Sequence, residues 1–277
     1  MKKIILILTV LAALSLACAA LGFGGADGNN SPEVAGSNNM PPENSVVVEG
    51  AAADSGLFNT DSPCYNPFYP LGEGMLYTYQ TYYLDPGNET PEPADVHTYE
   101  LETVDETEDT VTVQLRFSDV TSEVKWQCGA EGLFSSEYAQ FDVQSLGDSV
   151  QIDTVSYEGV TLPTEEAWFV GNTWNMDYEI NMSYQVQGMD VASHVVGALV
   201  NEIIAIEDVT VPVGTYSEAY KVETTGTITT DTIMPGSSVS NDIDLTMTSW
   251  YVKGVGMVKQ ISNDISGTSV TELIATE

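Results

Sequence analysis

The chain has 277 residues, of which 41 are Asp or Glu and only 7 are Lys or Arg, so its formal net charge is −34. No basic residue occurs between Lys3 and Arg116. This composition argues against binding to nucleic acid or anionic lipid head groups, because both need clustered cations.

The N-terminus predicts an export signal. Two lysines precede the apolar run Ile4–Leu14, and Ala17 stands just before Cys18. The run is shorter than the roughly 20 apolar residues of a transmembrane helix. We therefore predict a signal peptide over residues 1–17 and a lipid on Cys18, with the protein extracytoplasmic and anchored at a bacterial cell surface or envelope membrane. Ser15 stands where such signals usually carry Leu, so secretory cleavage at an Ala-x-Ala-like site stays open as the alternative.

Residues 18–62 predict a disordered acidic linker. This stretch is rich in Gly, Asn, Ser, Pro and Ala and contains few aromatic residues. It cannot bury enough apolar surface to offset the entropy lost on ordering. If Cys18 is lipidated, the linker would act as a stalk. Residues 63–277 then form one domain, by length.

The domain has a β pattern throughout. Its clearest signal is a hairpin, in which His97–Thr103 and Val111–Phe117 alternate apolar and polar residues around the acidic turn Asp105–Asp109. We predict a mostly β fold, a curved antiparallel sheet that forms a half-barrel or open barrel. Further strands are predicted at Met75–Thr81, Val150–Ser156, Met176–Met182, Tyr216–Thr230, Leu245–Tyr251, Val255–Ile261 and, as a last edge strand, Ser269–Ile274.

Two segments allow more than one structure. His194–Ile206 is apolar enough for a buried strand or an amphipathic helix, and we favour the strand. Leu133–Leu146 predicts the domain's one short helix, because Phe134, Tyr138 and Phe141 would share a helical face.

Cys64 and Cys128 remain once Cys18 is lipidated or removed. An even number of cysteines in an oxidising compartment predicts a disulfide between them. Two buried free thiols are the alternative. The spacing of the pair is not that of a zinc site.

Three motifs resemble those of a group of uncharacterised bacterial lipoproteins. Pro70–Tyr79 follows a P-L-x-x-G-x-x-W-x-Y opening with Tyr77 in place of Trp, Val209–Tyr216 follows V-T-V-P-A-G-T-F/Y with Val213 in place of Ala, and Trp250–Lys259 follows W-Y-x-x-G-V-G-x-V-K. The resemblance implies a curved antiparallel sheet, distantly analogous to LolA-like lipoprotein carriers. Its motifs are turns and strand corners, so it transfers no catalytic residue.

Signatures of catalysis are missing, and we predict neither an enzyme nor a cofactor. His97 and His194 lie in different halves of the domain, and no nucleophile elbow, phosphate loop or zinc-protease motif occurs. Four tryptophans could form a glycan-binding face, although core packing is the commoner role. They are Trp126, Trp168, Trp174 and Trp250.

Acidic clusters raise the question of calcium, although solvated surface is the simpler interpretation and we predict no metal site. The clusters are Asp105, Glu106, Glu108 and Asp109; Asp85 with Glu89; and Asp242 with Asp244.

Binding or a structural role in the envelope is therefore the leading hypothesis, with an apolar small molecule or lipid on the concave face of the sheet. A glycan-binding or glycan-active surface protein and a calcium-stabilised adhesion module are the alternatives. The oligomeric state is left open.

Overall fold

The computed structural model describes residues 62, 64–72, 74–84, 96–117, 120–135, 151–186, 189–264 and 267–277. The signal peptide and, apart from residue 62, the linker lie outside this range, so their boundaries stay predictions. Among the described residues the only helical segment is the 3-10 turn η3 (Glu165–Ala167), and none has the length and apolar character of a membrane-spanning helix. The strands are β1 (Leu76–Leu84), β2 (His97–Glu106), β3 (Thr110–Phe117), β4 (Val120–Gly129), β5 (Gly132–Ser135), β6 (Gln151–Gly159), β7 (Leu162–Pro163), β8 (Thr173–Val186), β9 (Met189–Val211), β10 (Gly214–Met234), β11 (Ser237–Val252), β12 (Gly256–Asp264) and β13 (Gly267–Thr276).

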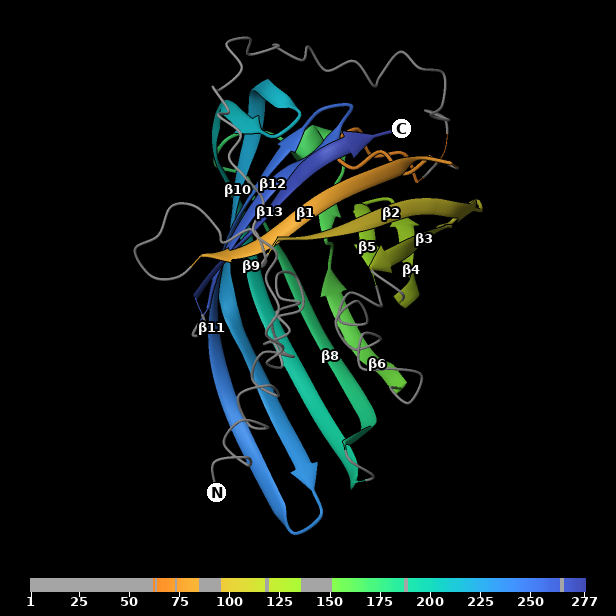
Figure 1. Cartoon of the computed structure of the whole chain (residues 1–277), viewed down its shortest axis with the longest axis vertical. Coiled ribbons are helices and arrows are strands. Elements are labelled where there is room, and N and C mark those ends of the chain that lie inside the picture. The colour runs from red at the N-terminus through yellow and green to blue at the C-terminus, as the bar shows by residue number, and fades with distance from the viewer. Residues whose placement is uncertain are drawn as a thin grey trace, which may run out of the picture.

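All of these strands form one antiparallel sheet in the order β6-β8-β9-β10-β11-β12-β13-β1-β2-β3-β4-β5-β7. The sheet is strongly curved and does not close into a barrel (Figure 1). The predicted fold class is therefore confirmed. The prediction of β13 as an edge strand was wrong, because β13 pairs with β12 on one side and with β1 on the other. Local alternation reveals a strand but not its neighbours.

The two edges of the sheet approach each other where β6 continues into β7. Val160 donates its backbone N–H to the carbonyl oxygen of Asn175 in β8 at 3.2 Å. Thr161, the next residue, donates to the carbonyl oxygen of Leu133 in β5 at 2.9 Å. The chain thus passes from one edge of the sheet to the other within two residues, and we call this crossing the seam.

Glycine is required on both sides of the seam. Gly132 has φ 138° and Gly159 has φ 87°, values that side-chain-bearing residues rarely adopt. A Cβ at Gly132 would lie 2.1 Å from the carbonyl oxygen of Leu162, and one at Gly159 would lie 2.1 Å from that of Asn175. A methyl group at Gly132 would force β5 away from β7, and one at Gly159 would force β6 away from β8.

Residues 64–72, the cap segment, are tied to the seam end of the sheet. Cys64 and Cys128 form a disulfide with their Cα atoms 4.8 Å apart, so the predicted bond is present. Asn66 donates its side-chain amide to a β7 carbonyl oxygen at 2.9 Å. The Phe68 ring stacks on Trp168 with centroids 3.9 Å apart. The cap segment therefore completes the main apolar core, which also includes Tyr77, Tyr79, Val111, Val113, Val124, Ile203, Val222, Val258 and Leu273.

The ambiguous segments are resolved in different ways. His194–Ile206 lies entirely within β9, which confirms the strand. The proposed helix over Leu133–Leu146 was wrong at its start, because Leu133–Ser135 belongs to β5, where backbone pairing with β4 and β7 outweighs the helical periodicity. Residues 136–146 lie outside the described residues.

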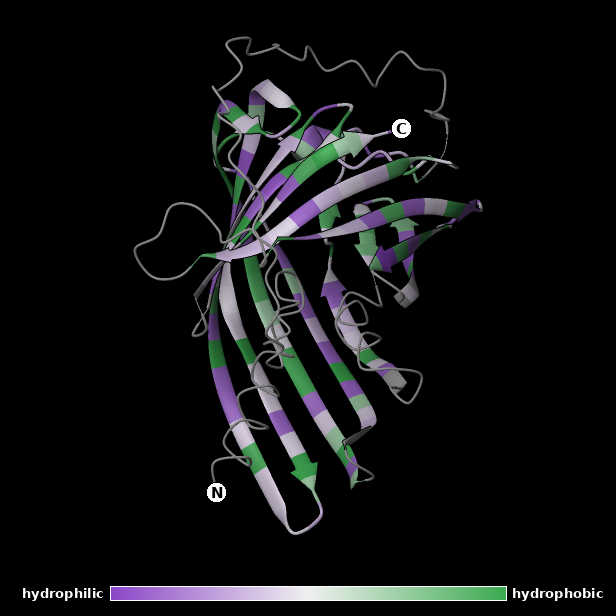
Figure 2. Ribbon diagram, in the orientation of Figure 1, coloured by the Kyte–Doolittle hydropathy of each residue, from purple (hydrophilic) through white to green (hydrophobic). Residues whose placement is uncertain are grey.

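Strands β8, β9, β10 and β11 are long, with 14, 23, 21 and 16 residues. Their far halves extend well beyond β1 and β2 (Figure 1). Side chains alternate along β9 between buried residues such as Leu199 and exposed ones such as Val200. Hydropathy alternates along the other long strands as well (Figure 2). This period of two gives the extension an inward and an outward face.

Candidate apolar binding face

A second apolar cluster lies on the inward face of the extension and is separate from the main core. Every member that the structure describes comes from β8, β9, β10 or β11, and no described side chain of β1–β5, β12 or β13 belongs to it. We call it the long-strand face. Its buried members are Met176, Ile180, Met182, Val195, Leu199, Ile228, Ile243 and Leu245.

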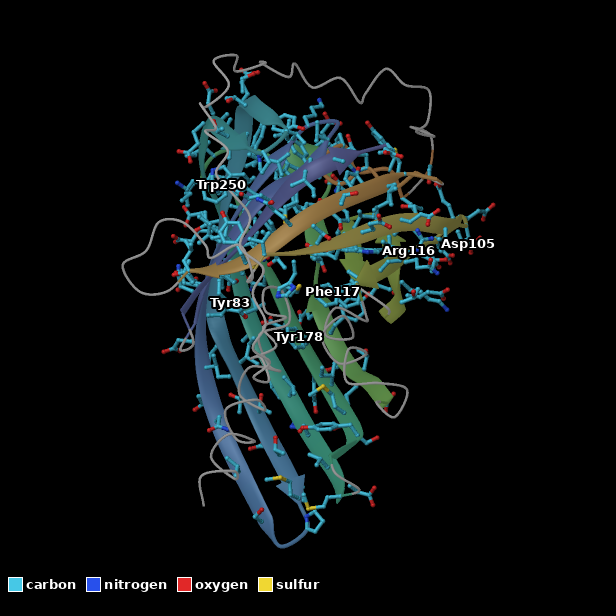
Figure 3. The ribbon with its side chains drawn as sticks, in the orientation of Figure 1. Tyr83, Asp105, Arg116, Phe117, Tyr178 and Trp250 are labelled. Carbon is cyan, nitrogen blue, oxygen red and sulfur yellow. A yellow bond between two sulfur atoms is a disulfide. The ribbon has the colours of Figure 1, made fainter. Side chains whose placement is uncertain are left out.

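Tyr178 packs against this cluster from the middle of β8 (Figure 3). It stands opposite Gly197 in the β8–β9 register. A Cβ at Gly197 would lie 2.3 Å from the Tyr178 ring, so the ring covers the glycine. Two methionines give the same face unbranched, adaptable side chains. Such side chains would let this cluster, whose buried members are at most 9% exposed, adjust around an irregular ligand.

A buried polar belt separates the long-strand face from the main core. On β9 and β10, Thr224 donates to Asn201 Oδ1 at 2.6 Å. On β11 and β12, the Gln260 amide donates to Ser249 Oγ at 3.1 Å. Further round the sheet, Thr271 of β13 donates to Thr81 of β1 at 3.2 Å. The register places Ser249, Gln260, Thr271 and Thr81 in one row across four strands, which explains why the apolar surface splits into two clusters.

Three buried hydroxyls near the long-strand face, those of Ser269, Thr230 and Tyr184, have no hydrogen-bond partner among the described residues. Ser269 Oγ lies beside the belt on a residue that is 1% exposed, and Thr230 Oγ1 lies among the apolar side chains on a residue that is 5% exposed. Leaving a buried hydroxyl without a partner costs about 1–3 kcal/mol. The Ser269 and Thr230 hydroxyls are therefore suited to receive a polar atom of a ligand. Burial raises the pKa of Tyr184, and the nearby Ser193 hydroxyl opposes that rise.

The outward face of the extension is mixed, with exposed valines on β9 and a row of polar side chains across four strands. Asp153, Asn181, His194 and Asp231 stand opposite one another across β6, β8, β9 and β10. They contribute to an open concavity of about 680 Å³. His194 Nε2 lies 2.8 Å from Glu179 Oε1, in a pair that is more than one-third exposed on both sides. This geometry is that of a solvated surface pair.

The other predicted site residues are distributed as follows. Cys18 lies outside the described residues, as do Asp85 and Glu89. His97 lies on β2, away from His194, and tilts against Phe117 at 5.9 Å. Asp105 lies at the end of β2, where Figure 3 shows it projecting away from the sheet. Within the part of the chain that the structure describes, no three His, Cys, Asp or Glu side chains converge as a metal site would require.

Three of the four tryptophans are core residues. Trp126 and Trp168 are each 6% exposed and Trp250 is 8% exposed, while Trp174 is partly buried beside Trp168. Trp250 donates to Glu207 Oε1 at 2.9 Å, and Lys221 lies 3.1 Å from the same oxygen. These hydrogen bonds lower the pKa of Glu207. The tryptophans thus pack the fold and do not form an open stacking platform.

The motifs of the lipoprotein resemblance meet at one end of the main core. Tyr79 of the first motif donates its hydroxyl to the carbonyl oxygen of Met257 in the third at 2.8 Å. Gly256 approaches Pro70, and a Cβ there would lie 3.6 Å from the Pro70 Cδ atom. In the second motif, Val209 and Val211 end β9, and Tyr216 follows the turn into β10. All three are corners of the fold, as expected of motifs that carry structure.

Comparison with solved structures supports this fold. A Parabacteroides distasonis protein, provisionally assigned as a lipoprotein, superposes with a TM-score of 0.52 at 19% identity, over 77% of this chain and 99% of its own. A Bacteroides fragilis protein, provisionally assigned as exported with a YmcC-like fold, gives 0.47 at 14% identity over 76% of this chain and 99% of its own. The second score carries no structural argument. No family model and no curated protein matches the chain.

Proposed function

We propose that the protein is an exported lipoprotein without catalytic activity, anchored through Cys18, that holds the acyl chain of an amphiphile against the long-strand face. One observation carries the proposal. Among the described residues, the long-strand face is an apolar cluster built only from β8–β11, outside the core that folds the rest of the domain. Stability of the main core does not require such a surface, whereas a ligand site does.

The polar belt supports an amphiphile over a plain hydrocarbon. An acyl chain on the long-strand face would bring its polar end to the belt, where Ser269 Oγ has no partner. The net charge of −34 disfavours an anionic head group, so the polar end should be neutral or cationic.

Export and anchoring are supported by the N-terminal sequence. The apolar run Ile4–Leu14 ahead of Cys18 has the layout of a lipoprotein signal. The Parabacteroides distasonis protein of similar fold is itself provisionally assigned as a lipoprotein. Mass spectrometry of the mature N-terminus tests this part, and an unmodified N-terminal alanine would remove the anchor from the proposal.

The alternatives have weaker support. A glycan-binding role would draw on the tryptophans, three of which are buried. A calcium-stabilised module would draw on acidic clusters, among which Asp242 and Asp244 each accept a bond from a β10 threonine. Catalysis would need cooperating groups, but His97 lies on β2 and His194 on β9, in different halves of the sheet.

Binding is tested with alkyl ligands of increasing length and a neutral head group, measured by calorimetry and by native mass spectrometry after gentle purification. Each methylene that enters the site should add up to about 0.8 kcal/mol, or roughly fourfold in affinity. Leu199→Gln should abolish the length dependence, because Leu199 is 1% exposed on the long-strand face. Val200→Gln is the matched control on the opposite face, where Val200 is 45% exposed.

Ser269→Ala tests the contribution of the ligand's polar end separately from that of its alkyl chain. It should weaken binding of polar-headed ligands and leave the gain per methylene unchanged. Thermal unfolding of each variant checks that the domain still folds. The proposed acyl-chain site would be refuted if the Leu199→Gln and Val200→Gln proteins bound equally well. It would also be refuted if affinity did not depend on chain length.

A further inference from the structure

An open strand edge borders the extension and is independent of the long-strand face. β12 pairs with β11 only from Thr246 to Val252. From Ser237 to Leu245, β11 pairs with β10 on one side, and no described strand lies on its other side. We propose that this edge is a docking site for an extended polypeptide segment whose residues alternate between basic and apolar, added as a strand next to β11.

The edge is regular and offers hydrogen-bonding groups at known positions. The β10–β11 register runs from Tyr220↔Tyr251 to Met234↔Ser237 without a shift. The loop between the two strands has two residues, so Met234 and Ser237 flank it as a hydrogen-bonded pair, and bonded and non-bonded pairs alternate from there. Ser240, opposite Asp231, is in a non-bonded pair. Its backbone N–H and C=O therefore face the open side.

Of the usual protections of an edge strand, this edge has only charged side chains, those of Asp242 and Asp244. Natural edges are blunted by charged side chains, above all lysine, by proline or by a β-bulge. Residues 237–245 contain no proline or lysine, and this part of the β10–β11 ladder has no bulge. By contrast, β6, at one end of the sheet order, carries a register shift between Thr154 and Ser156.

Charge and burial define the segment that fits. Asp242 and Asp244 are exposed on the outward face, where each accepts one threonine hydroxyl, at 2.7 Å from Thr229 and 3.2 Å from Thr227. Carboxylates retain further acceptor sites after one such bond. Ile243 and Leu245 of the same strand are buried on the inward face. A strand laid alongside would thus place cations beside the two aspartates and apolar side chains beside Ile243 and Leu245.

A second copy of this chain is a poor occupant. Pairing β11 with itself around Ile243 would set Asp242 against Asp244 of the other copy. Pairing it with β6 would bring Asp153 and Glu158 to the same acidic face, since they stand opposite Asn181 and Asp177. Like charges directly opposite each other destabilise a strand pair. No Lys or Arg occurs between Lys221 and Lys253 to compensate.

The probe is a nine-residue peptide of alternating Lys and Val with blocked ends, titrated into full-length protein by fluorescence anisotropy in low salt. Controls are the same peptide N-methylated at alternate residues and one with Glu for Lys; neither should bind. Asp242→Asn with Asp244→Asn should weaken binding at least about tenfold. Ser240→Pro should abolish it, because proline removes an outward N–H that β10 does not use; Ser240→Thr is the conservative control.

Circular dichroism and the melting temperature of Ser240→Pro establish that the hairpin persists. If that variant binds the peptide as well as Ser240→Thr, attraction is by net charge alone and the docking site is refuted. Retained binding of the N-methylated peptide would refute strand addition in the same way. If sedimentation shows a dimer that Ser240→Pro dissolves, the edge is a self-association site and the basic partner is wrong.

Discussion

The Cys64–Cys128 disulfide is expected to supply a large part of the stability of the domain. The bond joins residues 64 positions apart in sequence. Closing a loop of that length restrains the unfolded chain by about 4 kcal/mol at 25 °C in the chain-entropy treatment. For a domain of this size, that loss corresponds to a fall of about 10 °C in melting temperature.

Cys64→Ala combined with Cys128→Ala removes the bond, and a Cys18→Ala background prevents lipidation in both proteins. Urea unfolding gives the free energy. The disulfide-containing protein should lose about 4 kcal/mol when fully reduced, and the double variant should not respond to reductant. Reduction also frees the cap segment, so tryptophan fluorescence should report movement of Phe68 away from Trp168. An unchanged midpoint after complete reduction would refute the reasoning.

Three further predictions concern stability. Gly132→Ala should cost at least about 3 kcal/mol, because its methyl would strike the β7 backbone 2.1 Å away, whereas Gly74→Ala, also at positive φ but in open space, should cost about 1 kcal/mol in urea unfolding. Glu272→Ala should cost about 3 kcal/mol, because it strands the Lys259 ammonium 2.8 Å away in a partly buried site; Lys259→Met with Glu272→Met should recover most of the loss. Burial, then Glu272, raises the pKa of Tyr82 from its ordinary value of 10 to about 12. The Tyr82 hydroxyl therefore stays protonated to a higher pH in the folded state than in the unfolded state, and the free energy of unfolding falls as pH rises from 10 to 12. Tyr82→Phe should reduce that fall, to which other buried tyrosines also contribute, and an identical slope in the two proteins would contradict the assignment.

Alternation was sufficient to predict most of the strands. The hairpin of β2 and β3 has the register Leu101↔Leu115, with both residues inward, as the pattern at His97–Thr103 and Val111–Phe117 indicated. β4 was not predicted, because its inward residues Val124, Trp126 and Cys128 alternate with the charged or polar Glu123, Lys125 and Gln127 and form too short an apolar pattern. β5 and β7 are too short to show any period.

The candidate site was not visible in the sequence for a different reason. Inward positions of β10 include Thr224, Thr230 and Thr232, so this strand shows a polar residue on both faces. The division into a main core, a polar belt and a long-strand face depends on which strands lie side by side. Local periodicity carries no information about that order. A usable signal does exist, since Ile243 alternates with Asp242 and Asp244 just before the predicted strand that begins at Leu245.

The acidic residues of the open edge should both prevent self-association and attract the proposed basic partner. Asp242 and Asp244 oppose a second copy and attract a basic strand, so salt should act on the two processes in opposite directions. The screening length falls from about 10 Å at 0.1 M to about 3 Å at 1 M salt. Raising salt over this range should weaken binding of the Lys-Val peptide and promote self-association of the free edge. Asp242→Asn with Asp244→Asn should self-associate already at low salt, as measured by sedimentation. If salt moves both processes in the same direction, these aspartates do not control the edge.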